Sequence, residues 1–146
     1  MHNTSHMGRC ALLHVEDEDA SACLVRYALE EARILVNVYR VSNGEEALSF
    51  LRKQGHYEIA RTPNLVLLDL NMPRVDGWSV LREMQKSAYL CDIPVIVLTA
   101  SSVARDKERA YKLGARRYMT KPSSLDGLVE GIRSICRDFL DASGRA

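Results

Sequence analysis

The sequence predicts an α/β protein in which a doubly wound, five-stranded parallel sheet is covered by helices on both faces. Short apolar runs typical of buried strands alternate five times with helical segments, and such alternation produces parallel sheets joined by right-handed crossovers. Polar residues directly follow several of these runs, where strands would leave the core. The chain has 146 residues, 47% of them hydrophobic, which is enough for one domain with a substantial core.

Two strand and helix pairs are expected in the first half. The run Leu12-Leu13-His14-Val15 is a buried strand, and the amphipathic helix after it has apolar residues at helical spacing: Ala20, Cys23, Leu24, Tyr27 and Ala28. The β-branched segment 34–41 is the second strand, ended by the turn Ser42-Asn43-Gly44. The next helix has an inner face of Ala47, Phe50 and Leu51. Segment 54–64 is expected to be a surface loop, since it is longer than the usual ~4–6 residues.

The second half follows the same alternation. Leu65-Val66-Leu67-Leu68 predicts the third strand, and the third helix, after Pro73 and Gly77, has the inner residues Val80, Leu81 and Met84. The fourth strand starts at Pro94 and ends at Thr99. Ser101-Ser102 is expected to cap the fourth helix, and Gly114 to end it. A short strand at 117–119 precedes the last helix, whose apolar stripe is Leu125, Leu128, Val129, Ile132, Ile135 or Cys136, and Phe139.

Composition argues against several classes of function. The 20 basic and 19 acidic residues nearly balance, so no overall field favours nucleic acid or an anionic membrane. No apolar stretch approaches the ~20 residues of a spanning helix, and the polar start lacks the centre of a secretory signal, which predicts a cytoplasmic location. The scattered cysteines lie in or beside apolar segments, so buried reduced thiols are expected: Cys10, Cys23, Cys91 and Cys136.

Residues 10–141 are expected to form the domain. Residues 1–9 are a polar extension in which Ser5-His6-Met7 is compatible with the remnant of an expression tag, and 142–146 are a C-terminal tail. No output domain and no helix-turn-helix are expected within the chain, so contact with DNA would require a partner.

Charged and hydroxyl residues lie at the ends of four predicted strands. Glu16 and Asp17 follow the first, Asp69 the third, Thr99 closes the fourth, and Lys121 lies just beyond the fifth. These side chains are expected to meet, because open α/β sheets place their ligands at the carboxyl edge. Three carboxylates there would repel one another unless a cation neutralised them, and Mg²⁺ suits oxygen ligands. Any one of these acids alone would be better explained as a helix-capping or loop residue, but three acids together with the lysine and the threonine favour a site.

The same residues suit phosphoryl transfer. A carboxylate beside a metal can attack phosphorus and form an acyl phosphate, and Asp69 is the candidate nucleophile. Such transfer depends chiefly on positioning and charge neutralisation. Lys121 could hold one phosphoryl oxygen by its charge and Thr99 another by its hydroxyl, while backbone N–H groups supply further donors.

The sequence resembles the receiver domains of two-component response regulators, such as the chemotaxis regulator. The matching segments are Leu-Leu-His-Val-Glu-Asp ending at Asp17, Leu-Leu-Asp-Leu-Asn-Met-Pro around Asp69, Val-Leu-Thr-Ala around Thr99, and Tyr-Met-Thr-Lys-Pro around Lys121. The similarity covers nearly the whole chain in the family's order and spacing. It implies a (βα)5 flavodoxin-like sheet with strand order 2-1-3-4-5 in a stand-alone receiver domain.

The resemblance implies a role for each acidic residue. Asp69 would be phosphorylated and would bind the cation, Mg²⁺ or Mn²⁺, together with Asp17. Glu16 would hold the cation mainly through water, and Asn71 would contribute its backbone carbonyl. The protein would catalyse only its own phosphoryl transfer and autodephosphorylation.

Further implied features surround the phosphoryl group. Thr99 and Lys121 would bind it, and a cis peptide bond at Lys121–Pro122 would aim the lysine into the site. Tyr118 would be the switch aromatic that turns inward as the Thr99 hydroxyl moves, although an ordinary half-buried strand tyrosine is the alternative. Asn71 and Ser101 flank the path of attacking water and would tune the lifetime of the acyl phosphate.

The resemblance also implies partners. A histidine kinase would donate the phosphoryl group, and segment 54–64 looks like that of regulators encoded beside phytochrome-type kinases. The face made by the fourth helix, fifth strand and last helix would bind an unidentified downstream protein or a second copy of the chain. That face would carry Arg105, Lys107, Tyr111, Arg116 and Arg117. No direct contact with nucleic acid or membrane is expected.

Two alternative functions and one unusual residue complete the sequence-based expectations. A phosphorelay intermediate would pass its phosphoryl group on to a histidine phosphotransfer protein. A phosphatase of the haloacid dehalogenase class would need a second acid two residues after Asp69, where this chain has Asn71. His14 replaces the aliphatic residue expected on a buried strand, and we expect a core histidine with one hydrogen-bond partner rather than a ligand.

Overall fold

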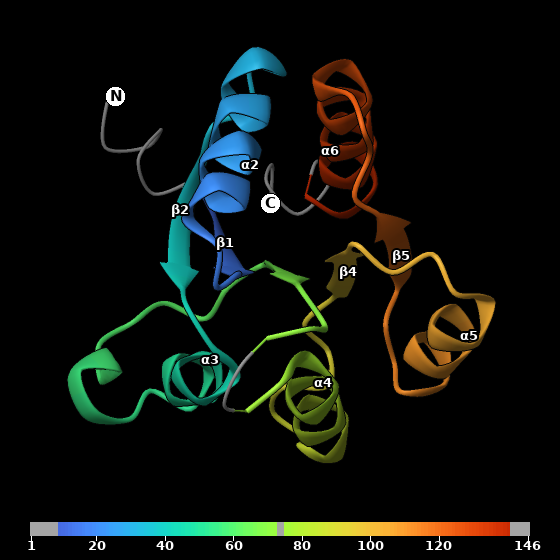
Figure 1. The fold of residues 1–146 in the computed structure, drawn as a ribbon. Helices are drawn as coiled ribbons and strands as arrows, with labels where there is room; N and C mark the ends of the chain where they lie inside the picture. Colours follow the sequence, from blue (N-terminus) through green and yellow to red (C-terminus); the bar gives the residue numbers. More distant parts are fainter. Residues whose placement is uncertain (1–8, 73–74, 141–146) are drawn as a thin grey trace, which may run out of the picture.

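The computed structural model describes residues 9–72 and 75–140. The sheet has five parallel strands in the order β2-β1-β3-β4-β5, which confirms the predicted topology (Figure 1). Its strands are β1 (Cys10–Val15), β2 (Val36–Val41), β3 (Leu65–Leu68), β4 (Val95–Thr99) and β5 (Arg117–Thr120). The predicted extension 1–9, apart from Arg9, the tail 142–146 and Pro73 lie outside the described residues.

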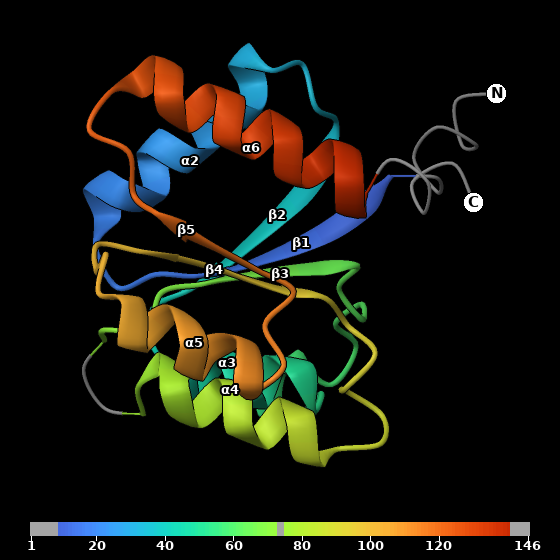
Figure 2. The ribbon, with the colours of Figure 1, turned by 90° about the vertical axis from the view of Figure 1, so that its right-hand side faces the viewer.

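In the described residues, five α-helices and one short 3₁₀ turn lie between the strands or after the last one. They are α2 (Asp19–Glu31), α3 (Gly44–Leu51), η1 (Gly55–Tyr57), α4 (Gly77–Lys86), α5 (Ala104–Lys112) and α6 (Leu125–Phe139). Figure 2 shows α2 and α6 on one face of the sheet and α3, α4 and α5 on the other. No helix in the described parts of the chain is long and apolar enough to cross a bilayer.

Each face of the sheet has its own apolar core, because successive strand residues point to opposite sides. Leu12, Leu67 and Ile96 belong to the core shared with α2 and α6. Leu13, Leu68 and Val97 belong to the core shared with α3 and α4. The central strands β1, β3 and β4 are buried along their whole length, so their carboxyl ends are held rigidly.

The face that α2 turns to the core differs from the expected one. Leu24 and Tyr27 are 48% and 44% exposed, and Cys23 is exposed as well. The buried residues are Ala22, Val25, Ala28 and Leu29. The predicted residues and the buried residues both have helical spacing. The second set is buried because it is the one that faces β1 and α6. By contrast, the inner residues predicted for α3 and α4 are confirmed.

Three of the five α-helices in the described residues start with a side-chain cap, whereas the N-cap residues of α2 and α5, Glu18 and Val103, make none. Asn43, Asp76 and Ser124 each accept a hydrogen bond from a backbone N–H in the first turn of α3, α4 and α6. The predicted Ser101-Ser102 cap of α5 is wrong, because the N-cap position falls on Val103 and has no side-chain cap. Gly114 ends this segment with φ of +103°, a conformation that favours glycine.

The four cysteines divide into two classes. Cys10 and Cys136 are buried free thiols, as expected. Cys23 and Cys91 are exposed, so the prediction of burial is wrong for them. Cys23 lies on the outer side of α2, and Cys91 lies in the turn before β4, where an apolar neighbourhood in sequence does not produce burial.

Candidate functional site

The carboxyl edge of the sheet brings the predicted acidic, hydroxyl and lysine side chains together. Glu16, Asp69 and Thr99 are buried, with exposed fractions of 1%, 7% and 0%. Asp17 is exposed, and Lys121 is partly exposed. Polar side chains lie this deep because the hydrogen-bonded backbone continues past the strand ends. The N–H of Glu16 donates to Val41, that of Asp69 to Val15, and that of Lys121 to Thr99.

Glu16, Asp17 and Asp69 form a compact acidic cluster. Each offers one carboxylate oxygen, and these oxygens lie within 4.8 Å of one another. Hard divalent cations prefer such oxygen ligands. The ammonium of Lys121 already bridges two of the three acids, at 2.9 Å from Glu16 and 3.4 Å from Asp69. The residues present therefore suit a cation, which would relieve the repulsion between the carboxylates.

Lys121 is held by three acceptors from different elements. Besides the two carboxylates, its Nζ lies 3.4 Å from the hydroxyl oxygen of Ser21 on α2. Burial alone would lower the pKa of Lys121, but the bonds to Glu16 and Asp69 outweigh burial and raise that pKa. Burial raises the pKa of Glu16, which Lys121 opposes. The lysine is thus a fixed cation directed at the cluster.

The two oxygens of Asp69 have different surroundings. Oδ1 accepts hydrogen bonds from the Thr99 hydroxyl at 3.0 Å and from the backbone N–H of Asn71 at 3.2 Å. Oδ2 lies 3.4 Å from Lys121 Nζ. A hydroxyl, an N–H and an ammonium therefore already surround the Asp69 carboxylate. The same donors could bind the oxygens of a phosphoryl group attached to it.

Gly77 is required for the close approach of α4 to Asp69. Its N–H donates to the carbonyl of Leu70 at 3.2 Å. A Cβ at this position would lie 2.2 Å from the Asp69 carbonyl oxygen and 2.6 Å from Leu70 Cα. No side chain fits there without displacing backbone. Sequence reasoning placed Gly77 only before a helix, because a tertiary contact of this kind leaves no local signal.

The predicted cis peptide bond at Lys121–Pro122 is not found. The described residues contain no cis peptide bond, so this bond is trans. Trans is the preferred form even before proline. The lysine nevertheless reaches Glu16 and Asp69, so its aim here comes from the end of β5 and from its acceptors.

Tyr118 links β5 to the loop after β4. Its hydroxyl donates to the Ser101 carbonyl at 2.8 Å, and the Thr120 hydroxyl contacts the same oxygen at 3.2 Å. The Tyr111 hydroxyl lies 3.1 Å from the Tyr118 backbone nitrogen and accepts its N–H. Of the basic residues expected on this face, Arg117 is partly buried and paired with Asp138 at 2.5 Å. The exposed ones are Arg105, Lys107 and Arg116.

His14 is buried on β1, with 2% of its surface exposed, which confirms its place in the core. Burial, reinforced by the nearby cations Lys121 and Arg40, lowers the pKa of His14 to about 4. The ring is therefore neutral at physiological pH, a form that suits a position between two cations.

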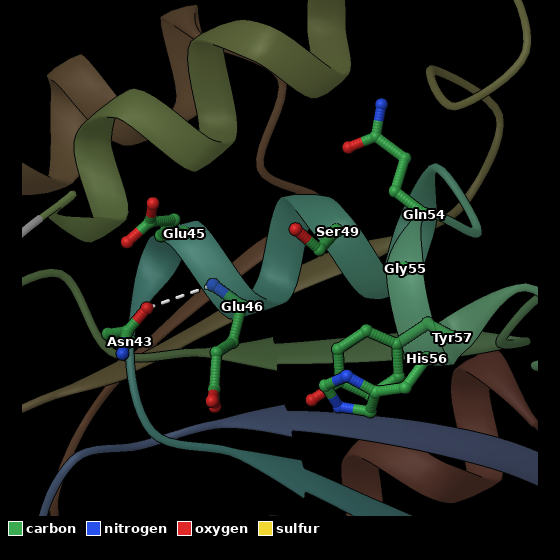
Figure 3. A pocket seen from close by; sticks show the side chains of 8 residues that line it. All are labelled: Asn43, Glu45, Glu46, Ser49, Gln54, Gly55, His56 and Tyr57. Carbon is green, nitrogen blue, oxygen red and sulfur yellow. Dashed lines mark hydrogen bonds between the residues drawn. The ribbon is translucent and has the colours of Figure 1, made fainter.

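A separate pocket lies between α3 and η1, on the outer side of the molecule (Figure 3). The Asn43 side chain at its edge accepts from Glu46 N–H and caps α3. The lining residues are Asn43, Glu45, Glu46, Ser49, Gln54, Gly55, His56 and Tyr57. None belongs to the acidic cluster, so this pocket is distinct from the candidate site.

Comparison with known proteins agrees with this geometry. The profile of the response regulator receiver domain matches residues 12–133. Response regulator Rcp1 of Synechocystis is 40% identical over 126 residues, which are 84% of this chain and 86% of Rcp1.

Solved structures give the same result. The phosphorylated cyanobacterial phytochrome response regulator RcpA superposes with a TM-score of 0.86 at 35% identity, covering 92% of this chain and 96% of RcpA. The Mn²⁺-bound form of response regulator Rcp1 superposes with a TM-score of 0.83 at 37% identity, covering 90% and 95%.

Proposed function

Because this chain belongs to the family of response regulator receiver domains, we propose that it is a phosphorylation switch in which Asp69 accepts a phosphoryl group from a histidine kinase. The observation that carries the proposal is the surroundings of the Asp69 carboxylate. This buried group lies within hydrogen-bonding distance of Thr99, Lys121 and the Asn71 N–H, beside two further acids.

In the transfer step, an Asp69 carboxylate oxygen attacks the phosphorus of a phosphohistidine. A bond forms between oxygen and phosphorus as the bond between phosphorus and nitrogen breaks, and the imidazole leaves with the electron pair. Lys121 binds one phosphoryl oxygen, and the Thr99 hydroxyl donates to another. Backbone N–H groups near Asn71 provide further donors. Hydrolysis of the acyl phosphate would then be tuned by Asn71 and Ser101.

Asp17 and Asp69 would bind the divalent cation directly, Glu16 through water and Asn71 through its backbone carbonyl. Mg²⁺ is the expected ion and Mn²⁺ the alternative. When bound, the cation neutralises charge on the carboxylates and on the incoming phosphoryl oxygens. Glu16 would exchange its contact with Lys121 for the hydrated cation, which frees the lysine for the phosphoryl group.

Thr99 and Tyr118 would transmit phosphorylation to the surface formed by α5, β5 and α6. The Thr99 hydroxyl touches Asp69 directly, and Tyr118 contacts the loop that follows Thr99 through the Ser101 carbonyl. A change at the phosphoryl group therefore has a short path to exposed residues on α5. A downstream protein or a second copy of the chain would bind this surface.

A kinase of the phytochrome type is the favoured donor, since the similar proteins include a cyanobacterial phytochrome response regulator. A phosphorelay intermediate is the second candidate, because the same acyl phosphate can return to a histidine. A phosphatase of the haloacid dehalogenase class is disfavoured, since Asn71 cannot act as its general acid.

Phosphotransfer from a phytochrome-type histidine kinase carrying labelled phosphate tests this function. We expect label to move to the wild-type chain in the presence of Mg²⁺, and not to Asp69→Asn or when EDTA replaces Mg²⁺. Adding an unlabelled histidine phosphotransfer protein then separates the two outputs, because only a relay intermediate passes the label on. Label on Asp69→Asn equal to that on the wild type would contradict the assignment.

A further inference from the structure

Arg40 on β2 connects the acidic loop after β1 to the neighbouring strand. Its Nε donates to the backbone carbonyl of Glu16 at 3.0 Å, and its Nη1 lies 2.7 Å from Oδ1 of Asp19. Asp17 lies between these two residues in the chain. A single guanidinium therefore holds the loop on both sides of the exposed member of the acidic cluster.

We propose that Arg40 is a positioning residue for the divalent cation, which fixes the loop that presents Asp17. This inference rests on the proposed function, since that function assigns the cation to the cluster. Arg40 touches neither the cation nor the phosphoryl group. It acts through the Glu16 backbone and through Asp19.

The backbone contact explains why fixing the loop matters. Glu16 is the first residue after β1, and its N–H still pairs with Val41. Its carbonyl is bound by Arg40 instead. Both the N–H and the carbonyl of Glu16 are therefore held. The Glu16 side chain can leave Lys121 and turn to the cation without moving Asp17. Residues that orient metal ligands in this way typically affect affinity by about 10–100-fold.

The contact with Asp19 removes a competing carboxylate. Four consecutive acids, Glu16 to Asp19, follow β1, and a cation could be drawn to the wrong ones. The ion pair with Arg40 directs Asp19 towards β2. The arginine fork binds the carbonyl and the carboxylate through two different nitrogens in a fixed planar geometry, which the single ammonium of a lysine does not reproduce.

A purely structural role accounts poorly for this residue. Asp19 is 91% exposed in its pair with Arg40, and such pairs stabilise folded proteins little. The remaining nitrogen, Nη2, is buried without a hydrogen-bond partner among residues 9–72 and 75–140. Leaving a buried donor unpaired costs free energy that an apolar residue would avoid. Fixing the loop that carries Asp17 would explain why an arginine occupies position 40.

Mn²⁺ binding to Arg40→Lys tests the assignment, with free Mn²⁺ measured by electron paramagnetic resonance. Lysine keeps the charge and loses the fork, so the expected result is a Kd for Mn²⁺ about tenfold above that of the wild type. The thermal midpoint of the EDTA-treated protein should stay unchanged. Arg52→Lys is the matched control, since Arg52 pairs with Glu83 at 3.0 Å between α3 and α4 on the opposite face of the sheet, and its Kd should equal the wild-type value.

Asp19→Asn provides a second variant at a fully accessible position, where misfolding is not expected. If Asp19 acts by holding the loop, this variant should raise the Kd for Mn²⁺ equally in about 0.1 M and about 1 M salt. If Asp19 acted only through its charge, the effect would be screened at the higher salt. An unchanged Kd for Arg40→Lys would overturn the assignment of Arg40 alone. If the wild type itself bound no Mn²⁺, both this inference and the cation site of the proposed function would fail.

Discussion

At the scale of single residues, the candidate site combines buried polar groups with the exposed carboxylate of Asp17. Thr99 and Asp69 are polar or charged, yet both are buried. Their mutual hydrogen bond satisfies part of their polarity, as buried polar groups require. The Asn71 N–H and the Lys121 ammonium provide further partners for the Asp69 carboxylate.

Buried His14 makes stability depend on pH. In the unfolded chain a histidine binds a proton below its usual pKa of 6.5, whereas in the folded protein the pKa of His14 is lowered to about 4. Between these values the unfolded state binds more protons, so stability falls as pH is lowered from about 6.5 to about 4. His14→Leu should lack this part of the loss, which amounts to about 3 kcal/mol.

Urea unfolding of wild type and His14→Leu, in EDTA at pH 7 and pH 4, measures the difference. Acidic groups common to both proteins cancel in the comparison. A constant difference in the free energy of unfolding across this range would contradict a neutral, buried His14.

The two classes of cysteine should differ in reactivity. Burial raises the pKa of Cys136 to about 12 and also raises the pKa of Cys10, so neither thiol forms the reactive thiolate near pH 8. Cys23 and Cys91 are exposed. Iodoacetamide at pH 8, followed by peptide mass spectrometry, should label only these two in the folded protein and all four in urea. Equal labelling rates for Cys136 and Cys23 would refute the burial of Cys136.

The sequence alone could identify most of the site residues. It could not identify the residues that hold them in position. Asp69 and Thr99 could be found because a polar residue directly after a buried strand is a local pattern. Arg40 could not be found, since a charged residue on an edge strand normally faces solvent. Its role depends on a bond to a backbone carbonyl 24 residues away.

At the scale of elements, the alternation of strands and helices in the sequence predicts the strand order and the helix layers. It does not predict how each helix is rotated about its own axis. Five apolar strands separated by helices leave few topologies for a parallel sheet. The rotation of α2 was predicted wrongly, because Leu24 and Tyr27 lie at a helical spacing and so do the buried Val25 and Leu29. Which stripe is buried is decided by the elements that α2 meets, and one of them, α6, is distant in sequence.

The junction between β3 and α4 should tolerate no side chain at position 77. Alanine normally favours helices over glycine, but its Cβ would lie 2.2 Å from the Asp69 carbonyl oxygen. We expect Gly77→Ala to lower the free energy of unfolding by about 1–3 kcal/mol and to slow phosphorylation of Asp69.

Gly127→Ala, the same change in the first turn of α6, serves as the control. Its Cβ would meet no atom closer than the Ser124 hydroxyl at 3.0 Å, so its cost should be smaller. Urea unfolding and the rate of phosphorylation by phosphoramidate measure both effects. A Gly77→Ala protein as stable and as reactive as the wild type would contradict the close packing.

At the scale of the whole molecule, we expect the acidic cluster to couple folding to the binding of a divalent cation. Three carboxylates converge at one edge of the folded sheet and separate when the chain unfolds. A cation that binds only the folded state stabilises it, by about 2.7 kcal/mol at a concentration one hundred times its Kd. Mg²⁺ should therefore raise the thermal midpoint of the wild type.

Asp17→Asn is a suitable comparison, because Asp17 is exposed and its replacement disturbs no core contact. This variant should lose most of the Mg²⁺ effect. In EDTA it should be at least as stable as the wild type, since one repelling charge has been removed. An equal rise of the midpoint in both proteins would place the cation elsewhere.

Treatment with phosphoramidate and Mg²⁺, followed by mass spectrometry of intact protein and peptides, shows whether Asp69 accepts a phosphoryl group. The wild type should gain the mass of one phosphoryl group, located on the peptide that contains Asp69 and lost on exposure to hydroxylamine. Asp69→Asn, and the wild type in EDTA, should gain none. A folded wild-type protein that remains unmodified, or that carries the phosphoryl group on another residue, would contradict the account.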